Sequence, residues 1–208
     1  MPELAPQFHP LPAWARWSAL IWLAIWVPTY LYYWGSSSFL FLCDLAVLLA
    51  CAGIWTSNAL LISSQALSSL VVDTAWTADV VWMLLFGRHL IGGTEYFFDP
   101  LYPLFVRLMS TFHIVLPIVL LMSLRRTGYD SRALRLQSLI AVAALIASRF
   151  ANPHKNINFA FTDPFFGRFW GPAPVHLAVI LAPLILLIYV PTHIILKRSF
   201  PPFKAHSN

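Results

Sequence analysis

The chain has 208 residues, of which 59% are hydrophobic and only 10% are charged, and its formal net charge at pH 7 is +5. Soluble domains carry about 25% charged residues, so this composition excludes an ordinary soluble domain and indicates a membrane protein. The positive charge lies mostly in short segments between apolar runs, which suits anionic lipid headgroups. We expect membrane lipids as partners and no nucleic acid, because no basic module with interleaved aromatic residues is present.

Apolar runs follow one another along the whole chain. A helix needs roughly 20 apolar residues to cross about 30 Å of hydrocarbon, and five runs have suitable length: 14–34, 39–55, 101–124, 133–150 and 174–196. The stretch 58–92 contains Asp73 and Asp79 and is too long for one crossing, so it predicts one long broken helix or two short helices. No alternating strand pattern is present. We therefore expect an all-α, polytopic membrane helix bundle with six or seven transmembrane helices.

The domain organisation is simple. We expect a short N-terminal segment (1–13), a single transmembrane helical domain (14–198) and a short polar C-terminal tail (199–208). The first apolar run is too long and too rich in Trp and Tyr for a secretory signal peptide, and it lacks a small-residue cleavage site. It is therefore predicted to remain as a membrane span.

Orientation follows from the lysine and arginine residues, which collect in short cytoplasmic loops. Two segments are basic, 125–135 and the tail, and the predicted topology places both on one side of the membrane. That side is predicted to be the cytoplasmic side of a bacterial inner membrane. The segment 149–171 and the acidic turn around Glu95 and Asp99 are predicted on the opposite side. The N-terminus is then cytoplasmic with six spans and external with seven.

Two chemically reactive side chains lie inside apolar runs. Cys43 lies in FLFLCDLAVLLACAG and His113 in RLMSTFHIVLPIVLL. A thiol and an imidazole can act as nucleophile and general base, so this pair is the leading candidate for catalysis. Asp44 points about 100° away from Cys43 on a helix and is expected to orient a neighbour or line the cavity. Pro117 frees a backbone carbonyl near His113, which either fixes the imidazole tautomer or only marks a kink.

Structural interpretations of the same residues stay open. A buried cysteine is often a small inert hydrophobic residue, and an intramembrane histidine often only bonds helices together. Cys43 and Cys51 are eight residues apart on one run, which is too far for a disulfide, so both are predicted to be free thiols. No HxxxH or HxxH spacing and no cofactor fingerprint is present. We therefore expect no metal and no cofactor, although ligands drawn from different spans are not excluded by spacing.

Several motifs, in their order along the chain, resemble the transmembrane protein 164 family of intramembrane acyltransferases and its bacterial integral membrane relatives. The motifs are LCDLAVLL, the turn TEYFFDPLYP, STFHIVLP, NINFAF and the final GPAP. Together they span about residues 39–196. Ile114 follows the histidine where members of that family usually have glycine.

The resemblance implies a lipid acyltransferase in which a cysteine accepts a fatty acyl group and a histidine acts as its base. By motif, these roles fall on Cys43 and His113. The substrate is then a phospholipid, with a lysolipid hydroxyl or water as acceptor, so acyl-ester hydrolysis is equally consistent. An oxyanion needs hydrogen-bond donors in a medium of low dielectric constant. Asn156, Asn158 and Gln65 are the candidates.

Two other functions stay open. In a small-solute or lipid transporter, Asp73, Asp79, Arg107 and His113 would line a path, and the stretch 58–92 would be a discontinuous helix. In a non-catalytic membrane scaffold protein, the polar side chains would only hold helices together.

Overall fold

The computed structural model describes residues 11–203, so most of the predicted N-terminal segment and the end of the tail lie outside the described residues. The described chain is all-α, as predicted, and helices occupy all five predicted apolar runs. The longer helices are α1 (Ala13–Trp34), α2 (Leu42–Thr56), α3 (Ala59–Phe86), α6 (Phe112–Thr127) and α7 (Ala133–Ser148). The C-terminal run is continuous through α8 (Ala173–Pro183), the π-helical η4 (Leu184–Tyr189) and α9 (Val190–Ser199). Short helices connect them: η1 (Ser36–Leu40), α4 (Glu95–Phe98), α5 (Leu104–Met109), η2 (Pro153–Lys155) and η3 (Ile157–Phe159).

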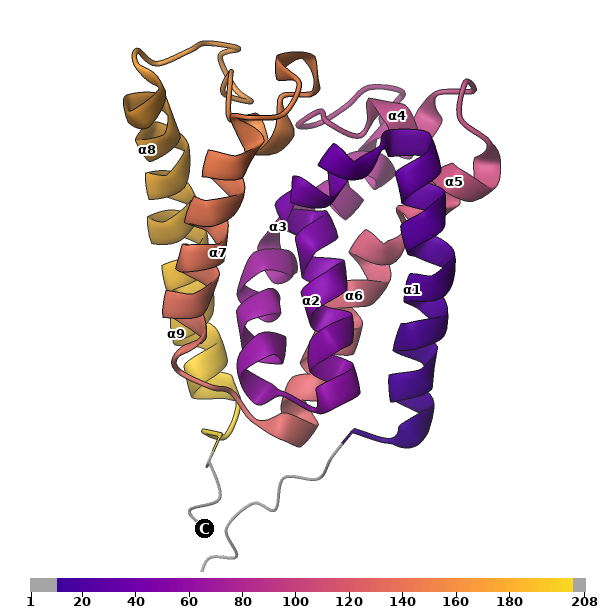
Figure 1. Ribbon diagram of the computed structural model, residues 1–208, viewed down its shortest axis with the longest axis vertical. Helices are drawn as coiled ribbons and strands as arrows, with labels where there is room; N and C mark the ends of the chain where they lie inside the picture. The colour runs from indigo at the N-terminus through magenta and orange to yellow at the C-terminus, as the bar shows by residue number, and fades with distance from the viewer. Residues whose placement is uncertain (1–10, 204–208) are drawn as a thin grey trace, which may run out of the picture.

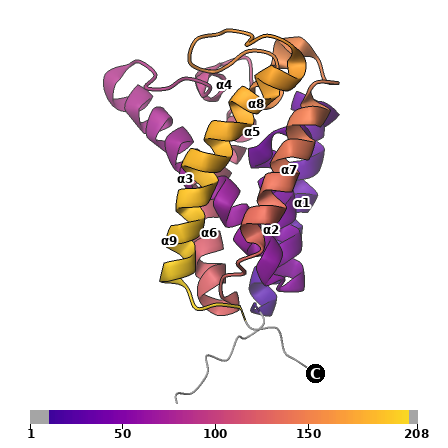
Figure 2. The same ribbon diagram turned by 90° about the vertical axis from the view of Figure 1, so that its left-hand side faces the viewer.

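The long helices stand side by side as an upright bundle, with the connecting loops gathered at its two ends (Figure 1). Helix α3 is central, because it packs against α2, α6, α7 and the C-terminal helices. Helix α1 packs on α2. The upper part of α3 leans away from the other helices (Figure 2).

The distribution of polarity differs from that of a soluble protein, mainly at the outer surface. Buried side chains include a polar row on α3, whereas large apolar side chains are exposed on the outer faces, such as Ile25, Leu85 and Leu187. Three helical stretches are long and apolar enough to cross a membrane: Ala59–Phe86, Leu104–Thr127 and Ala173–Ser199. Helices α2 and α7 are apolar but shorter. Large apolar side chains on the outer surface, with ionisable side chains turned inward, are the arrangement expected of helices surrounded by lipid.

Most of the stretch 58–92 forms one continuous helix, α3 (Ala59–Phe86), and residues 87–92 begin the loop that follows it. The prediction of a broken helix or of two short helices was wrong. The Asn58 side chain caps α3 by accepting a hydrogen bond from Leu61 N (3.0 Å), and α3 ends at Phe86, with Gly87 (φ +67°) as its C-cap. Both aspartates of this helix are buried. Because both side chains face the protein interior, the helix continues past them without a break.

The α5–α6 run is interrupted close to His113. The chain makes tight backbone bonds there, from Ser110 N to Arg107 O and from Thr111 N to Leu108 O (both 3.0 Å). Pro117 frees the carbonyl of His113, as predicted, and the Thr77 hydroxyl donates to that oxygen at 3.5 Å. The freed carbonyl of His113 therefore accepts a hydrogen bond from α3 and does not fix the imidazole.

The two ends of the bundle agree with the predicted grouping of loops. Tyr129 donates through its backbone N to Pro201 O (2.9 Å), and Phe203 N donates to Tyr129 O (3.0 Å), so the two basic segments meet at one end. The α4 region and the segment 149–171 lie at the other end (Figure 1). At the basic end, Arg132 pairs with Asp130 at 2.7 Å. Its hydrogen bonds to the Asp130 carboxylate lower the pKa of that group.

Candidate functional site

A cluster of polar side chains lies inside the bundle between α1, α2, α3 and α6, beneath α4. Its members, here called the polar cluster, are Tyr30, Cys43, Asp44, Asp73, Tyr96, Ser110 and His113. Five of them are buried, while Cys43 and Tyr96 are partly buried. Ionisable groups are rare in such positions because their desolvation is costly, so this cluster is the leading candidate for a functional site.

His113 is held in one orientation. Its Nδ1 donates to Ser110 O at 2.8 Å, and its ring stacks between Trp76 (centroids 4.4 Å apart) and Phe112 (4.0 Å). A carbonyl only accepts hydrogen bonds, so Nδ1 carries the hydrogen of the neutral ring and Nε2 holds the free lone pair. Nε2 lies 4.0 Å from Asp73 Oδ1. The interruption between α5 and α6 supplies the Ser110 carbonyl that fixes this tautomer.

Asp73 is the most unusual member of the cluster. It is fully buried, and within residues 11–203 neither carboxylate oxygen accepts a hydrogen bond of ordinary geometry. Its polar neighbours are the Ser69 hydroxyl, which interacts with it electrostatically, and His113. A buried carboxyl group without firm hydrogen bonds costs several kcal/mol, roughly 2–7 for a neutral polar group. Such a group is typical of a functional site.

Cys43 lies in the first turn of α2, where it interacts electrostatically with Asp44 and Asp73. His113 also adjoins Asp73. Cys43 and His113 therefore both lie near one carboxyl group, while among residues 11–203 no hydrogen bond joins the Cys43 thiol to the imidazole. Asp44 is buried there and interacts with Asp73. Ile114, in contrast, is 43% exposed and points away from the cluster.

Three hydroxyl groups form a chain along the cluster. Trp76 Nε1 donates to the Tyr96 hydroxyl (3.1 Å), Tyr96 interacts with the Ser110 side chain, and the Tyr30 hydroxyl lies 2.9 Å from Ser110 Oγ. Burial raises the pKa of Tyr96 in α4, so its hydroxyl keeps its proton. Neutral hydroxyls are suitable donors to a developing oxyanion.

Sequence reasoning missed these hydroxyl donors and the central position of Asp73. Tyr96 and Ser110 do lie within the motifs TEYFFDPLYP and STFHIVLP, and Asp73 is an ionisable residue in an apolar run. These positions were the sequence features that could have pointed to the three residues. Only the packing of α1, α3 and α4 around His113 shows that they meet.

Gln65 lies outside the polar cluster. It is eight residues before Asp73 on α3, which is about 12 Å along the helix axis. Its Nε2 donates to Ser64 Oγ (2.9 Å) and to Gln137 Oε1 (3.4 Å), and Gln137 donates onward to the Tyr189 hydroxyl (3.3 Å). Gln65 therefore joins α3 to α7 and the C-terminal helix.

The two asparagine candidates are engaged in loop structure. Asn158 Oδ1 accepts from Leu42 N (2.9 Å), while its Nδ2 donates to Leu40 O and to Ser148 Oγ. Asn156 bonds within its own loop, to Phe161 and Thr162. Asn158 thus anchors the start of α2, one residue before Cys43. Neither amide has a donor directed at the polar cluster, so no contact supports their predicted oxyanion role.

Asp79 has a structural role outside the polar cluster. Its Oδ1 accepts hydrogen bonds from the backbone N of Leu90, Ile91 and Gly92, and its Oδ2 accepts from His89 Nδ1 and the Thr94 hydroxyl. The carboxylate therefore organises the loop that returns from α3 to α4, rather than lining the polar cluster.

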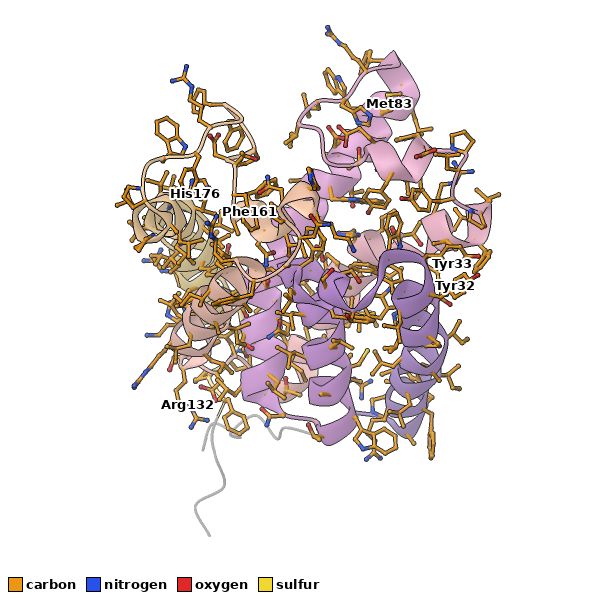
Figure 3. The ribbon with its side chains drawn as sticks, turned by 45° about the horizontal axis from the view of Figure 1, so that its top comes forward. Tyr32, Tyr33, Met83, Arg132, Phe161 and His176 are labelled. Carbon is orange, nitrogen blue, oxygen red and sulfur yellow. The ribbon has the colours of Figure 1, made fainter. Side chains whose placement is uncertain are left out.

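The remaining buried histidine is structural. His176 Nε2 donates to Phe159 O (2.9 Å), and its Nδ1 accepts from Trp170 N (3.3 Å), which joins α8 to the loop before it. The His176 ring packs on Phe169 (centroids 4.9 Å apart), and the Arg149 guanidinium stacks on the Phe161 ring (4.2 Å); Figure 3 labels His176 and Phe161. Among residues 11–203, no group of three His, Cys, Asp or Glu side chains is placed to hold a metal ion.

In comparisons with known proteins, no family model, no curated protein and no solved structure matches this chain.

Proposed function

We propose that the protein is an intramembrane lipid acyltransferase or acyl-ester hydrolase, with Cys43 as nucleophile and His113 as general base. What supports the proposal is that Cys43 and His113 both lie near Asp73, a buried carboxyl group without ordinary hydrogen bonds. The substrate class is a phospholipid of the surrounding membrane. In this proposal the chain crosses a bacterial inner membrane six times, as α1, α2, α3, α5–α6, α7 and α8–α9, with the C-terminus cytoplasmic.

The first step forms a thioester. His113 Nε2 takes the proton of the Cys43 thiol, directly or through the Asp73 carboxyl group, and Asp73 stabilises the resulting imidazolium. The sulfur attacks the ester carbonyl carbon, and the carbonyl π electrons move to oxygen. When this intermediate collapses, the bond from carbon to the lysolipid oxygen breaks. The proton on Nε2 passes to that oxygen, which leaves as a hydroxyl.

The second step repeats this sequence with a new nucleophile. A lysolipid hydroxyl or a water molecule gives its proton to Nε2 and attacks the thioester carbon, and Cys43 leaves as thiolate and recovers a proton. In both steps the developing oxyanion needs donors, and the neutral hydroxyls of Tyr30, Tyr96 and Ser110 are the groups in the cluster suited to this role. One removed donor costs about 10²–10³-fold in rate in well-studied hydrolases.

The test is detection of the thioester. Purified protein is incubated in mixed-phospholipid vesicles, quenched with acid, and analysed by peptide mass spectrometry for an acyl adduct that hydroxylamine removes. We expect the adduct on the peptide containing Cys43, its absence in Cys43→Ala, and adduct formation at least about 10²-fold slower in His113→Gln.

The matched control is Cys51→Ala, which removes the other thiol of the same helix and is expected to retain the adduct. Thermal unfolding of each variant shows whether it is folded. Absence of an adduct on folded wild-type protein, or an adduct that survives Cys43→Ala, would refute the proposed chemistry.

A further inference from the structure

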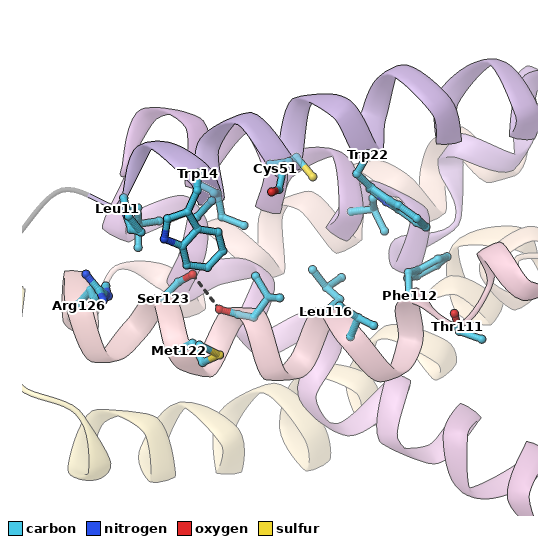
Figure 4. Close-up of a pocket in the computed structure, with 18 residues that line it drawn as sticks. Leu11, Trp14, Trp22, Cys51, Thr111, Phe112, Leu116, Met122, Ser123 and Arg126 are labelled. Carbon is cyan, nitrogen blue, oxygen red and sulfur yellow. Dashed lines mark hydrogen bonds between the residues drawn. The ribbon is translucent and has the colours of Figure 1, made fainter.

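A second feature lies below the polar cluster, toward the basic end of the bundle. It is an apolar slot of about 400 Å³ between α1, α2 and α6 (Figure 4). Its walls include Trp22 and Ala15 of α1, Cys51 of α2, and Val119 and Met122 of α6. Small-molecule pockets are usually 300–1,000 Å³ and mostly apolar, so the slot has the size and polarity of a ligand site.

The slot is long and narrow. Along the α6 chain it reaches from Thr111 to Arg126, which at 1.5 Å per residue is about 22 Å. It follows the bundle axis, in the direction that lipid chains take in a bilayer about 30 Å thick. Phe112 lines its inner end and packs edge-on against Trp26 (centroids 5.9 Å apart), beside Tyr30. An elongated chain fits this shape better than a compact solute.

Charge is confined to one end of the slot. Arg126 is the one charged side chain among the described residues that line it, and it lies at the end near the basic segments. Within residues 11–203 it forms no hydrogen bond and no ion pair. Trp14, 67% exposed, lines the same end (Figure 4). A cation beside an exposed Trp is typical of the headgroup level of a membrane.

We infer that this slot binds an anionic phospholipid of the leaflet at the basic end, with one acyl chain between α1 and α6 and the headgroup phosphate at Arg126. The apolar walls take up the chain, and the unpaired guanidinium supplies the charge complementary to phosphate. Cys43 is not among the described residues that line the slot, which reaches Val47 one turn away on α2. The inference is therefore independent of the proposed acyl transfer and stands whether or not Cys43 carries an acyl group.

The test uses photoactivatable lipids. Full-length protein is reconstituted in phosphatidylcholine vesicles that contain a trace of phosphatidylglycerol with a diazirine in one acyl chain, irradiated, and mapped by peptide mass spectrometry. We expect label on the slot-facing positions of α1 and α6 in excess of the outward-facing positions. Diazirine-bearing phosphatidylcholine and free palmitate serve as the other two probes, and both are expected to label the slot less.

Two pairs of variants test the fit and the charge. Ala15→Phe fills the slot and is expected to reduce slot labelling several-fold, whereas Ala24→Phe adds the same ring to an exposed position of α1 outside the slot and leaves it unchanged. Arg126→Gln is expected to lower the preference for phosphatidylglycerol over phosphatidylcholine about five-fold. Arg125→Gln, which changes the neighbouring exposed arginine outside the slot, retains that preference.

Three results would overturn the inference. They are label spread evenly over inward and outward faces, equal effects of the two members of either pair, and stronger slot labelling by free palmitate than by the phospholipids. The arginine pair changes exposed side chains at a helix end, so it stays informative even if Ala15→Phe fails to fold.

Discussion

Replacement of Asp79 by alanine is expected to destabilise the protein strongly and to release the loop between α3 and α4. The carboxylate accepts five hydrogen bonds, three from consecutive backbone N–H groups, and is 1% exposed. Alanine removes every acceptor and leaves the three backbone donors without this partner, while the Thr94 hydroxyl and His89 Nδ1 still lie 3.0 Å apart. Asparagine keeps Oδ1 for the three backbone donors, and its amide can donate to the Thr94 hydroxyl and to His89 Nδ1.

The magnitude follows from the number of bonds. A hydrogen bond contributes about 1 kcal/mol net, and more when one partner is charged. Part of the loop can regain hydrogen bonds to water or lipid headgroups, so we expect Asp79→Ala to lower the free energy of unfolding by about 4 kcal/mol. For a chain of this size that corresponds to about 8–16 °C in midpoint temperature. Asp79→Asn should cost about 1–2 kcal/mol.

The assay is thermal unfolding in detergent, followed by Trp fluorescence, together with hydrogen exchange of residues 88–94. Asp99→Ala is the control in the same region, because within residues 11–203 the Asp99 carboxylate accepts a hydrogen bond from Leu101 N alone (2.9 Å). We expect fast exchange in 88–94 for Asp79→Ala and little change for Asp99→Ala. Equal midpoint temperatures for the two alanine variants would show that the carboxylate does not hold the loop.

Other changes test separate parts of the structure. Gly53→Leu should lower the free energy of unfolding by about 1–3 kcal/mol, because even a Cβ at Gly53 would lie 3.1 Å from Ile62 Cγ1. Gly87→Leu is the control, because Gly87 has open space around it and the change tests backbone strain alone. A smaller loss for Gly53→Leu than for Gly87→Leu would contradict the close packing of α2 on α3. Asn158→Ala should lower the free energy of unfolding by about 2–3 kcal/mol and slow any reaction at Cys43, because the Asn158 amide anchors the start of α2. An unchanged unfolding midpoint would contradict that anchoring. Hydrogen bonds from three backbone N–H groups and the Trp170 indole outweigh the effect of burial and lower the pKa of Asp163 below its unfolded value. Protection of the loop around Asp163 in hydrogen exchange should therefore be complete above about pH 4 and fall as the pH drops further. An equal fall in protection over the same pH range in Asp163→Asn would contradict this.

Much of the fold was predictable from the apolar runs, because helix length and hydropathy are tied to membrane thickness. The course of residues 58–92 was not. Asp73 and Asp79 looked like interruptions in the sequence, but both are buried on the inner face of one continuous helix. A charged residue breaks an apolar run in sequence without breaking the helix, provided that its side chain faces the interior. Sequence alone does not show which face that is.

The candidate site was predictable in part. Cys43 and His113 stood out as reactive groups in apolar runs, and the structure places both beside Asp73. The oxyanion candidates were chosen by residue type, which does not show where a side chain is already bonded. Asn158 and Gln65 use their amides to join helices and loops. The hydroxyls near His113 come from Tyr30, Tyr96 and Ser110, which only tertiary packing brings together.

Asp73 links the stability of the bundle to its proposed chemistry. A carboxyl group that is fully buried without ordinary hydrogen bonds is unfavourable, and natural proteins retain such groups mainly where function needs them. Asp73→Asn keeps the size of the side chain and removes its ability to exchange a proton or to become charged, so we expect a higher midpoint temperature together with slower thioester formation at Cys43. Thermal unfolding and the adduct assay on the same preparation measure both effects, with Asp44→Asn as the matched change in the neighbouring carboxyl group. If Asp73→Asn lowers stability and leaves the adduct rate unchanged, Asp73 is a structural residue and His113 must work without it.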